Sequence, residues 1–239
     1  MAALTWISGA SAGIGRALAD TVPWEGRVIG VSRRRPEGIE HLEADLADPS
    51  SWAAVGASFH RELTGFSGER VTFVHAAGTL DPIGFAGEVD SDAYRANVIL
   101  NSAAPQVLGH LFLAAGAALR VPRHLIMLTS GAARSVYSGW SSYGAAKAAI
   151  DQWVRDVGAE QTQRGGATVL AVAPGTVDTD MQARMRATSE HDFPARGKFV
   201  DLHRADKLSD PHDVARRIWA LLDDDVDNGT VLDLRQYTS

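Results

Sequence analysis

Short apolar runs alternate along this chain with longer stretches in which apolar positions recur at helical spacing. This alternation is typical of a parallel sheet with helices on both faces, because each return to a parallel strand needs a crossing helix. We expect strands at Ala3–Ser8, Arg27–Val31, Glu40–Leu46, Val71–His75, His124–Thr129, Thr168–Ala173 and Val231–Leu234. We expect helices at Ile14–Thr21, Ser51–Leu63, Ser91–Leu119 (broken near Pro105), Tyr143–Arg164 and Pro211–Leu222. The pattern predicts one doubly wound α/β domain in three layers, residues 1–239.

The least regular part of the chain is the segment 176–209, which is polar, mixed in charge and follows a predicted strand. It ends before the helix with the clearest start signal, where Asp210 can cap the first turn and Pro211 takes the first helical position. In open α/β sheets, ligands bind outside the carboxyl ends of the strands. We therefore expect residues 176–209 to cover a small-molecule substrate.

Composition narrows the class of protein. A formal net charge of −6 opposes binding to nucleic acid, whose phosphates need clustered cations. The absence of cysteine fits a reducing compartment and excludes disulfides and thiolate ligands. No apolar run approaches the ~20 residues of a membrane span, and the first predicted strand begins too early to leave room for a signal peptide. We expect a cytoplasmic protein without nucleic-acid or membrane partners.

A glycine-rich turn joins the first predicted strand to the first helix. It contains Gly9, Gly13 and Gly15, with Ser11 and Ile14 between them. Glycines there permit a tight turn and close approach of a pyrophosphate, while the amides at the helix N-terminus attract phosphate. No Gly-Lys-Ser/Thr follows, which excludes a P-loop. An ordinary glycine-rich turn has a similar composition, but the position after the opening strand favours a Rossmann-type dinucleotide site.

The end of the second strand distinguishes between dinucleotide cofactors. An NAD site usually carries an acidic residue there to hold the ribose hydroxyls, whereas this chain has Ser32 and Arg33. A hydroxyl and a permanently charged guanidinium suit the additional 2′-phosphate of NADP(H), so we expect NADP(H). Asp45 and Leu46, at the end of the third strand, are placed to meet the adenine, although Asp45 suits a turn cap equally well.

Three residues carry the candidate chemistry. Tyr143 and Lys147 are four apart in a predicted helix, so both side chains lie on one face. Ser130 directly follows a predicted strand, at the edge where ligands bind, and precedes Tyr143 by thirteen residues. A surface Tyr–Lys pair would show the same spacing, but the serine at the sheet edge favours the catalytic interpretation.

Together with the glycine turn, these residues resemble the short-chain dehydrogenase/reductase family over essentially the whole chain. The matching motifs are Ser8-Gly9-x-x-x-Gly13-x-Gly15, Ser130 followed by Tyr143-x-x-x-Lys147, and Pro174-Gly175-x-x-x-Thr179-x-Met181. Asn101, seven residues after Tyr94 and four before Pro105, matches the family's helix asparagine better than Asn97 does. One departure is His75-Ala76-Ala77-Gly78 in place of the family's Asn-Asn-Ala-Gly, and we interpret His75 as structural rather than as an acid or base.

The resemblance implies a role for each matching residue. Tyr143 is the acid/base, Ser130 bonds the substrate oxygen, and Lys147 bonds the nicotinamide ribose and lowers the tyrosine pKa from its usual ~10. Asn101 holds a water that links Lys147 to solvent. Val177, through its backbone, and Thr179, through its hydroxyl, hold the carboxamide or an adjacent phosphate. The other implied cofactor contacts are Ala77, Gly78, Pro174, Gly175 and Met181. No metal is implied.

Within the family, the closer resemblance is to the sepiapterin reductase and benzil reductase branch. The stretches that carry it are Gly139-Trp140, 177–184 and Lys207-Leu208-Ser209. The side chains expected to line an apolar pocket beside Ser130 and Tyr143 are Val136, Trp140, Met181, Phe193 and Phe199, although each also suits a core. The branch implies NADPH-dependent reduction of a benzil-like diketone or a pterin side-chain carbonyl. The family implies a homodimer or homotetramer formed by the helices around 101–119 and 143–164.

Three other functions fit parts of the sequence. A catalytically silent NADP-binding regulator would have lost Tyr143 or Lys147, and both are present. A sugar-nucleotide epimerase of the extended relatives is disfavoured by the short chain and the glycine spacing. A 3-oxoacyl-thioester reductase would need a basic entrance for an acidic carrier, for which the candidates are Arg184, Arg186 and Arg196.

Overall fold

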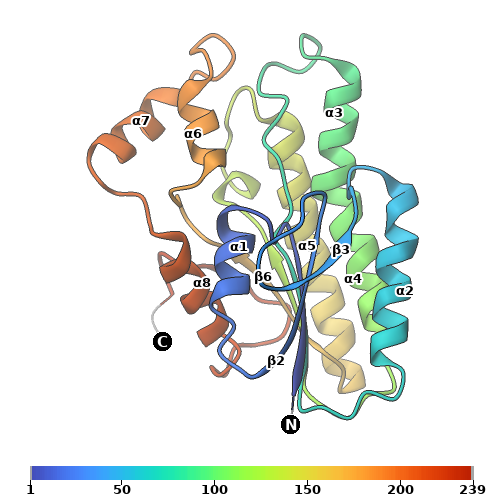
Figure 1. The fold of residues 1–239 in the computed structure, drawn as a ribbon. Helices are drawn as coiled ribbons and strands as arrows, with labels where there is room; N and C mark the ends of the chain where they lie inside the picture. Colours follow the sequence, from blue (N-terminus) through green and yellow to red (C-terminus); the bar gives the residue numbers. More distant parts are fainter. Residues whose placement is uncertain (1, 238–239) are drawn as a thin grey trace.

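The computed structural model describes residues 2–237 and contains one seven-stranded parallel sheet (Figure 1). The strands are β1 (Ala3–Ser8), β2 (Gly26–Ser32), β3 (Glu40–Glu43), β4 (Val71–His75), β5 (Arg123–Leu128), β6 (Thr168–Ala173) and β7 (Val231–Asp233). Their order is β3-β2-β1-β4-β5-β6-β7. The order reverses between β1 and β4, which opens the crevice where dinucleotides bind in sheets of this kind. The predicted doubly wound α/β fold is confirmed.

Helices cover both faces of the sheet (Figure 1). On one face, α1 (Gly13–Asp20) and α8 (Pro211–Ala220) share a core with the sheet. The opposite face carries α2 (Trp52–Leu63), α4 (Ala104–Ala115) and α5 (Ser141–Arg164). Three short helical segments surround the carboxyl ends of the strands: α3 (Ser91–Val98), α6 (Asp180–Ala187) and α7 (Arg196–Arg204). The remaining segments are η1 (Pro49–Ser51), the π-helical η2 (Ile99–Ala103) and η3 (Gly131–Ala133).

Aromatic side chains fill the core under α2 and α4. Trp6 of β1 and Phe73 of β4 are fully buried, as parallel strands covered on both faces require. Phe59 of α2 lies with its ring centroid 5.2 Å from that of Trp6 and 5.5 Å from that of Phe112 of α4. These contacts fix both helices against the strands whose carboxyl ends form the candidate site.

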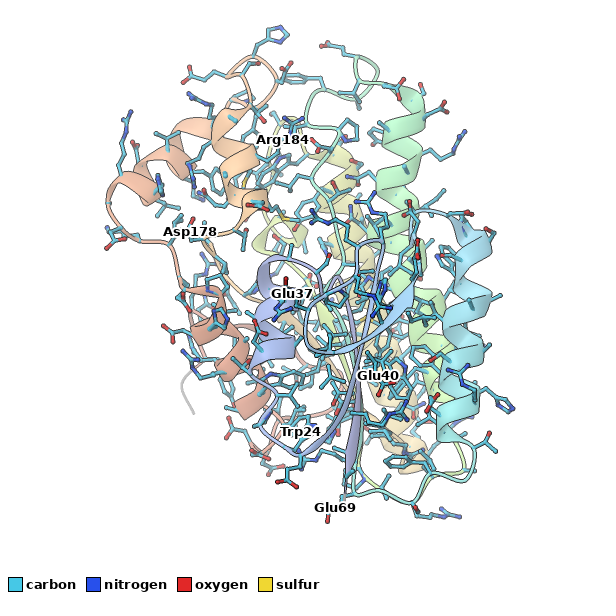
Figure 2. All side chains as sticks on the ribbon, in the orientation of Figure 1. Trp24, Glu37, Glu40, Glu69, Asp178 and Arg184 are labelled. Atoms are coloured by element: carbon cyan, nitrogen blue, oxygen red, sulfur yellow. The ribbon has the colours of Figure 1, made fainter. Side chains whose placement is uncertain are left out.

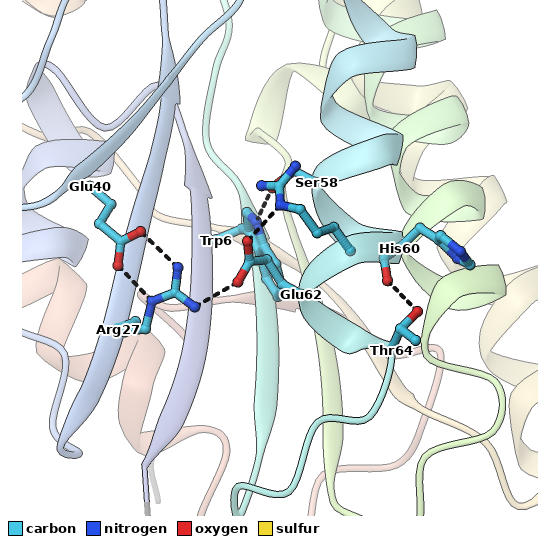
Figure 3. A network of polar contacts seen from close by, with 8 residues as sticks. Trp6, Arg27, Glu40, Ser58, His60, Glu62 and Thr64 are labelled. Carbon is cyan, nitrogen blue, oxygen red and sulfur yellow. Dashed lines mark hydrogen bonds and ion pairs between the residues drawn. The ribbon is translucent and has the colours of Figure 1, made fainter.

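A polar network fastens the sheet edge at the opposite, amino-terminal ends of the strands (Figure 3). Arg27 of β2 donates to Glu40 of β3 at 2.7 Å and to Glu62 of α2 at 2.6 Å. Beside it, the Trp6 indole donates to Ser58 of α2 at 3.3 Å. Since the Arg27 and Glu40 side chains are half exposed, the ion pairs contribute modestly to stability. The network belongs to the scaffold rather than to the candidate site.

The segment 176–209 contains two helices that the sequence pattern did not predict. Neither α6 nor α7 shows strong apolar periodicity, since the buried apolar side chains are Met185 in α6 and Phe199 in α7. The expectation of irregular structure was therefore wrong for much of the segment. The predicted extension of the third strand to Leu46 was also wrong, because β3 ends at Glu43.

The helix predicted at Ser91–Leu119 is modified near its middle rather than broken at Pro105. Its π-helical turn, η2, precedes Pro105, and helix α4 ends at Ala115. By length and composition alone, Ser91–Ala115 is apolar enough to cross a membrane, contrary to the expectation that no run approaches such a span. Leu108 and Phe112 nevertheless pack in the core, as in a core helix of a soluble protein.

Candidate active site

Ser130, Tyr143 and Lys147 come together where β5 ends against the first turns of α5. Ser130 has extended backbone and its Oγ accepts from the amide of Ala132 at 3.1 Å. The Tyr143 side chain is hydrogen-bonded to Ser130 and is 7% exposed. Lys147 is also buried, and its Nζ donates to the carbonyl of Leu128 at 2.8 Å. The structure thus places the three predicted catalytic side chains at one sheet edge.

Burial dominates the electrostatics of this trio. It raises the pKa of Tyr143, and the hydrogen bond with Ser130 opposes that rise. Burial lowers the pKa of Lys147 to about 8, while the nearby Asp151 carboxylate opposes that change. Lowering of the tyrosine pKa by Lys147 stays a prediction. Lys147 Nζ lies 5.7 Å from the Tyr143 ring centroid and donates to a backbone carbonyl.

Asn101 lies in the π-helical turn η2 and faces Lys147 across Gly78. Its side chain makes two hydrogen bonds with the backbone of Thr79. Nδ2 donates to the Thr79 carbonyl at 2.8 Å, and Oδ1 accepts from the Thr79 N–H at 3.1 Å. A Cβ on Gly78 would lie 2.9 Å from Asn101 Oδ1 and 3.8 Å from Lys147 Nζ.

Several contacts around the site were not predicted. Asn97, the rejected alternative to Asn101, is fully buried and donates to the carbonyl of Asp81 at 2.8 Å, so it holds the loop after β4. Arg235, just after β7, lies with its Cδ 3.1 Å from where a Cβ on Gly175 would be, and its guanidinium pairs with Asp233 at 2.6 Å. Arg235 could have been predicted to lie near the site from its position directly after a strand, because the carboxyl ends of parallel strands share one edge of the sheet.

The glycine turn has the close packing that a dinucleotide site needs. Gly9 has φ of +71°, and a Cβ there would lie 2.9 Å from the Cα of Ala77. A Cβ on Gly15 would lie 2.3 Å from the Gly9 carbonyl oxygen. The residue before α1, Ala12, supplies no side-chain cap, so the first amides of this helix are available to an anion. These features fit a pyrophosphate, with the half-buried Ser11 and Ile14 beside it.

The end of β2 presents an exposed arginine, Arg33, in a long ion pair. The Arg33 side chain is 76% exposed and its Nη1 lies 4.0 Å from Asp45 Oδ2. The Ser32 hydroxyl instead donates to the carbonyl of Arg34 at 2.7 Å, within its own loop. Asp45 accepts from the amide of Ala47 at 3.0 Å, which is the turn-capping role considered above. Arg33 is therefore the residue best placed here for a phosphate.

Helix α1 also fixes the loop that carries Arg33. Arg16 donates to the backbone carbonyl of Glu37, labelled in Figure 2, at 2.8 Å. At the next strand end, Leu46 is 3% exposed and its carbonyl accepts from the Trp52 indole at 3.0 Å. Both contacts hold the walls of the crevice independently of any ligand.

The segment after β6 meets the glycine turn from the other side of the crevice. Val177 pairs in parallel with Ser209, and the amide of Asp178 donates to the Ser209 carbonyl at 3.0 Å. A Cβ on Gly13 would lie 3.4 Å from Thr179 Cγ2, which brings the Pro174-Gly175 motif and the glycine turn together. Figure 2 labels Asp178 on this segment and Arg184 on α6.

An aromatic cluster covers Tyr143. Trp140 is stacked on Phe193, with ring centroids 4.4 Å apart, and its ring lies edge-on to Tyr143 at 5.7 Å. Phe193 and Phe199 are buried within the same cluster, and Met181 packs against it half-buried. The covering segment 176–209 therefore supplies much of the apolar surface next to the catalytic tyrosine.

Val136 differs from the other residues expected in the pocket, because it is 98% exposed. It lines an open groove of about 600 Å³ together with Phe85 and the outer residues of α5. Tyr143 is not among the lining residues of that groove. The groove therefore lies beside the reacting groups, and Val136 is at its rim.

Comparison with known proteins places the chain in a family. Residues 3–190 match the short chain dehydrogenase family. The chain belongs to this family. It is 30% identical to benzil reductase ((S)-benzoin forming) of Bacillus subtilis over 97% of this chain and 98% of that protein, and 29% identical to sepiapterin reductase of Mus musculus over 92% and 91%. A short-chain dehydrogenase/reductase structure from Saccharomyces cerevisiae superposes with a TM-score of 0.81 at 23% identity, covering 99% of this chain and 97% of that one.

This short-chain dehydrogenase is thus an oxidoreductase. Within residues 2–237 there is no group of three or more metal-ligating side chains placed to hold an ion. Ser130 and Tyr143 offer two hydroxyls to one substrate oxygen, and Lys147 supplies a buried amine behind them. Such a set can polarise a carbonyl and transfer one proton.

His75, where the family has asparagine, joins the ends of β1 and β4. The Ser8 hydroxyl oxygen accepts from the amides of Ala76 and Ala77 at 3.0 and 3.1 Å. Its proton is therefore free to be donated to His75 Nδ1, 3.1 Å away. Burial lowers the pKa of His75 to about 3, with the Lys147 charge acting in the same direction, so the ring is neutral. These contacts support the structural interpretation of His75.

Proposed function

We propose that this enzyme reduces a ketone or diketone of aromatic character, benzil-like or a pterin side-chain carbonyl, to the alcohol with NADPH. The observation that carries the proposal is the pair of hydroxyls of Ser130 and Tyr143 beneath the aromatic cluster of Trp140, Phe193 and Phe199. The relatives named benzil reductase and sepiapterin reductase support the same class of reaction.

Each catalytic side chain has one task in the proposal. NADPH, when bound, supplies the hydride. The Ser130 hydroxyl donates to the substrate carbonyl oxygen and orients it, and the Tyr143 hydroxyl gives that oxygen its proton. Lys147 holds the ribose and favours return of a proton to the tyrosine. Asn101 holds the water that connects Lys147 to solvent.

We propose that NADP(H) is held by the cofactor-binding residues expected from the sequence. They are Gly9, Ser11, Gly13, Ile14, Gly15, Ser32, Arg33, Asp45, Leu46, Ala77, Gly78, Asn101, Tyr143, Lys147, Pro174, Gly175, Val177, Thr179 and Met181. Their support is the open helix N-terminus of α1, the close approach at Gly9 and the exposed cation at Arg33.

Arg33 provides a test of cofactor choice. A charge-assisted bond to the 2′-phosphate contributes roughly 1.5–3 kcal/mol, so NADPH should bind at least about tenfold more tightly than NADH. Arg33→Ala should remove most of that difference, measured by the fluorescence of the bound dinucleotides. Arg95→Ala is a matched control, because Arg95 is similarly exposed, at 71%, on α3. Equal affinities of the parent protein for the two cofactors would refute the preference.

Substrate choice provides a second test. An apolar site rewards burial of a flat hydrophobic body at about 25 cal/mol per Å², whereas the hydroxyls of a sugar would be left unpaired. We expect a higher kcat/KM, with NADPH, for benzil or 1-phenyl-1,2-propanedione than for an open-chain sugar or a 3-oxoacyl thioester. A diketone is also more reactive, because its second carbonyl withdraws electrons from the first. A higher kcat/KM for the sugar or the thioester would overturn the substrate assignment.

The alternative of a 3-oxoacyl-thioester reductase has less support. Arg184 is paired with Asp81 at 3.2 Å and Arg196 with Glu190 at 3.4 Å. Paired cations attract an acidic carrier protein weakly, and the third candidate, Arg186, is half-buried. The silent-regulator alternative is disfavoured by the intact catalytic trio, and turnover of any carbonyl substrate would exclude it.

We also propose a cytoplasmic homodimer or homotetramer formed through the outer surfaces of α4 and α5. Val98 and Val107 are exposed large apolar side chains on the long helical stretch, and Ala145 and Ala148 are exposed on α5. A measurement of molar mass in solution by light scattering checks the assembly.

A further inference from the structure

Asp151 is a buried acid in α5 that none of the roles above uses. It lies one turn beyond Lys147 and is 3% exposed. Buried carboxylates are rare unless their charge and hydrogen bonds are compensated. Its position behind the catalytic lysine therefore calls for a physical reason.

The contacts of Asp151 connect the two elements that carry the catalytic trio. The Thr129 hydroxyl donates to Asp151 Oδ1 at 2.5 Å. One residue earlier, the Leu128 carbonyl accepts from Lys147 Nζ at 2.8 Å, and one residue later is Ser130. Two successive turns of α5 thus hold two successive residues of the strand end that presents the catalytic serine.

The surroundings of Asp151 are mostly cationic. Lys147 and Arg155 face it from its own helix, and Arg134 faces it from the loop after η3. On the other side of Lys147 is neutral His75, at the end of β4. Asp151 Oδ2 is buried and makes no hydrogen bond to the described residues. A half-satisfied buried acid is a poor source of stability, so stability alone does not account for it.

We propose that Asp151 is a positioning residue of the active site. Through Thr129 it fixes the strand end carrying Ser130 against the helix face carrying Tyr143 and Lys147, and its negative charge favours the ammonium form of Lys147. Asp151 contacts neither substrate nor cofactor. The kinetic part of the test rests on the proposed carbonyl reduction, and the titration part does not.

The kinetic test uses the hydroxyl of Thr129. Thr129→Val removes the donor at nearly constant volume, whereas Thr129→Ser keeps it. We expect kcat to fall about tenfold in the valine variant, because small displacements of catalytic groups are costly, and to recover most of that loss in the serine variant. The double variant Thr129→Val/Asp151→Ala should lose no more than the worse of its two single variants, because both remove the Thr129–Asp151 bond. The proposal would be contradicted if the kcat losses of the two single variants multiplied in the double variant. It would also be contradicted if Thr129→Ser and Thr129→Val lost kcat equally.

The titration test reads the charge on Lys147 directly. Only three lysines occur in the chain, and Lys198 and Lys207 are exposed, so ¹³C-lysine NMR can resolve the buried one. Removing the negative charge in Asp151→Asn should lower the pKa of Lys147 by about one unit. The high-pH limb of the kcat profile should move by the same amount. Asp156→Asn, an exposed acid on the same helix, is the matched control and should move neither.

The outcomes of the titration separate the possible roles. If Asp151 were purely structural, its substitution would lower the melting temperature but leave the Lys147 pKa and the high-pH limb of the kcat profile unchanged. That result would overturn the proposal. A parent protein that turned over none of the carbonyl substrates would refute the proposed function. The NMR comparison would then still decide the role of Asp151.

Discussion

Tyr143→Phe is expected to lower kcat by about 10²- to 10⁴-fold, the range for loss of a positioned general acid. The phenolic hydroxyl is the proposed proton donor beside Ser130, and with the side chain only 7% exposed, water has little access to replace it. The ring's packing against Trp140 is retained in the variant. Steady-state reduction of a diketone with NADPH, together with the NADPH dissociation constant, measures the effect. We expect the dissociation constant to change little.

Tyr137→Phe is the matched control for this experiment. Tyr137 packs against the same aromatic cluster, but its hydroxyl accepts from Lys198 at 2.8 Å. Its removal should change kcat only slightly. Lys147→Ala, in contrast, should reduce both kcat and NADPH affinity. If Tyr143→Phe retained kcat within a few-fold of the parent, the assignment of the acid/base would have to be abandoned.

The sheet was readable from the sequence because strands buried on both faces appear as continuous apolar runs. β1 and β4 are buried at every position and begin and end where expected. The trio was readable for a related reason, since Ser130 follows a strand and Tyr143 and Lys147 share a helix face. The spacing of the motifs thus predicted more of the candidate site than composition did.

Contacts between distant segments could not be read in this way. The Thr129–Asp151 bond joins residues 22 apart, and the Ser8–His75 bond joins residues 67 apart. Each depends on how a helix or strand is registered against its neighbour, which hydrophobic periodicity does not specify. Helices α6 and α7 were missed for another reason, since much of their stability comes from packing Met185 and Phe199 onto the aromatic cluster.

Buried histidines should make the fold sensitive to mild acid. His75 has its pKa lowered to about 3, and His124 has its pKa lowered to about 4, in both cases mainly by burial. Both are neutral in the folded state, whereas an unfolded histidine takes up a proton near pH 6.5. Their stabilising contribution is therefore complete above pH 6.5 and is lost as the pH falls towards the folded-state values. At pH 5 each should have lost about 2 kcal/mol of unfolding free energy.

His75→Asn tests this contribution, because asparagine can still accept from Ser8 and does not titrate. Urea unfolding measures the loss of unfolding free energy between pH 7 and pH 5. This loss should be about 2 kcal/mol smaller in the variant than in the parent. Ordinary carboxylates titrate mainly below this window, and Asp151, whose pKa is raised by burial, acts with the opposite sign in parent and variant alike. His191→Asn is the control, since its side chain is 81% exposed. An equal loss in parent and His75→Asn would show that His75 is not the acid-sensitive group at the junction of β1 and β4.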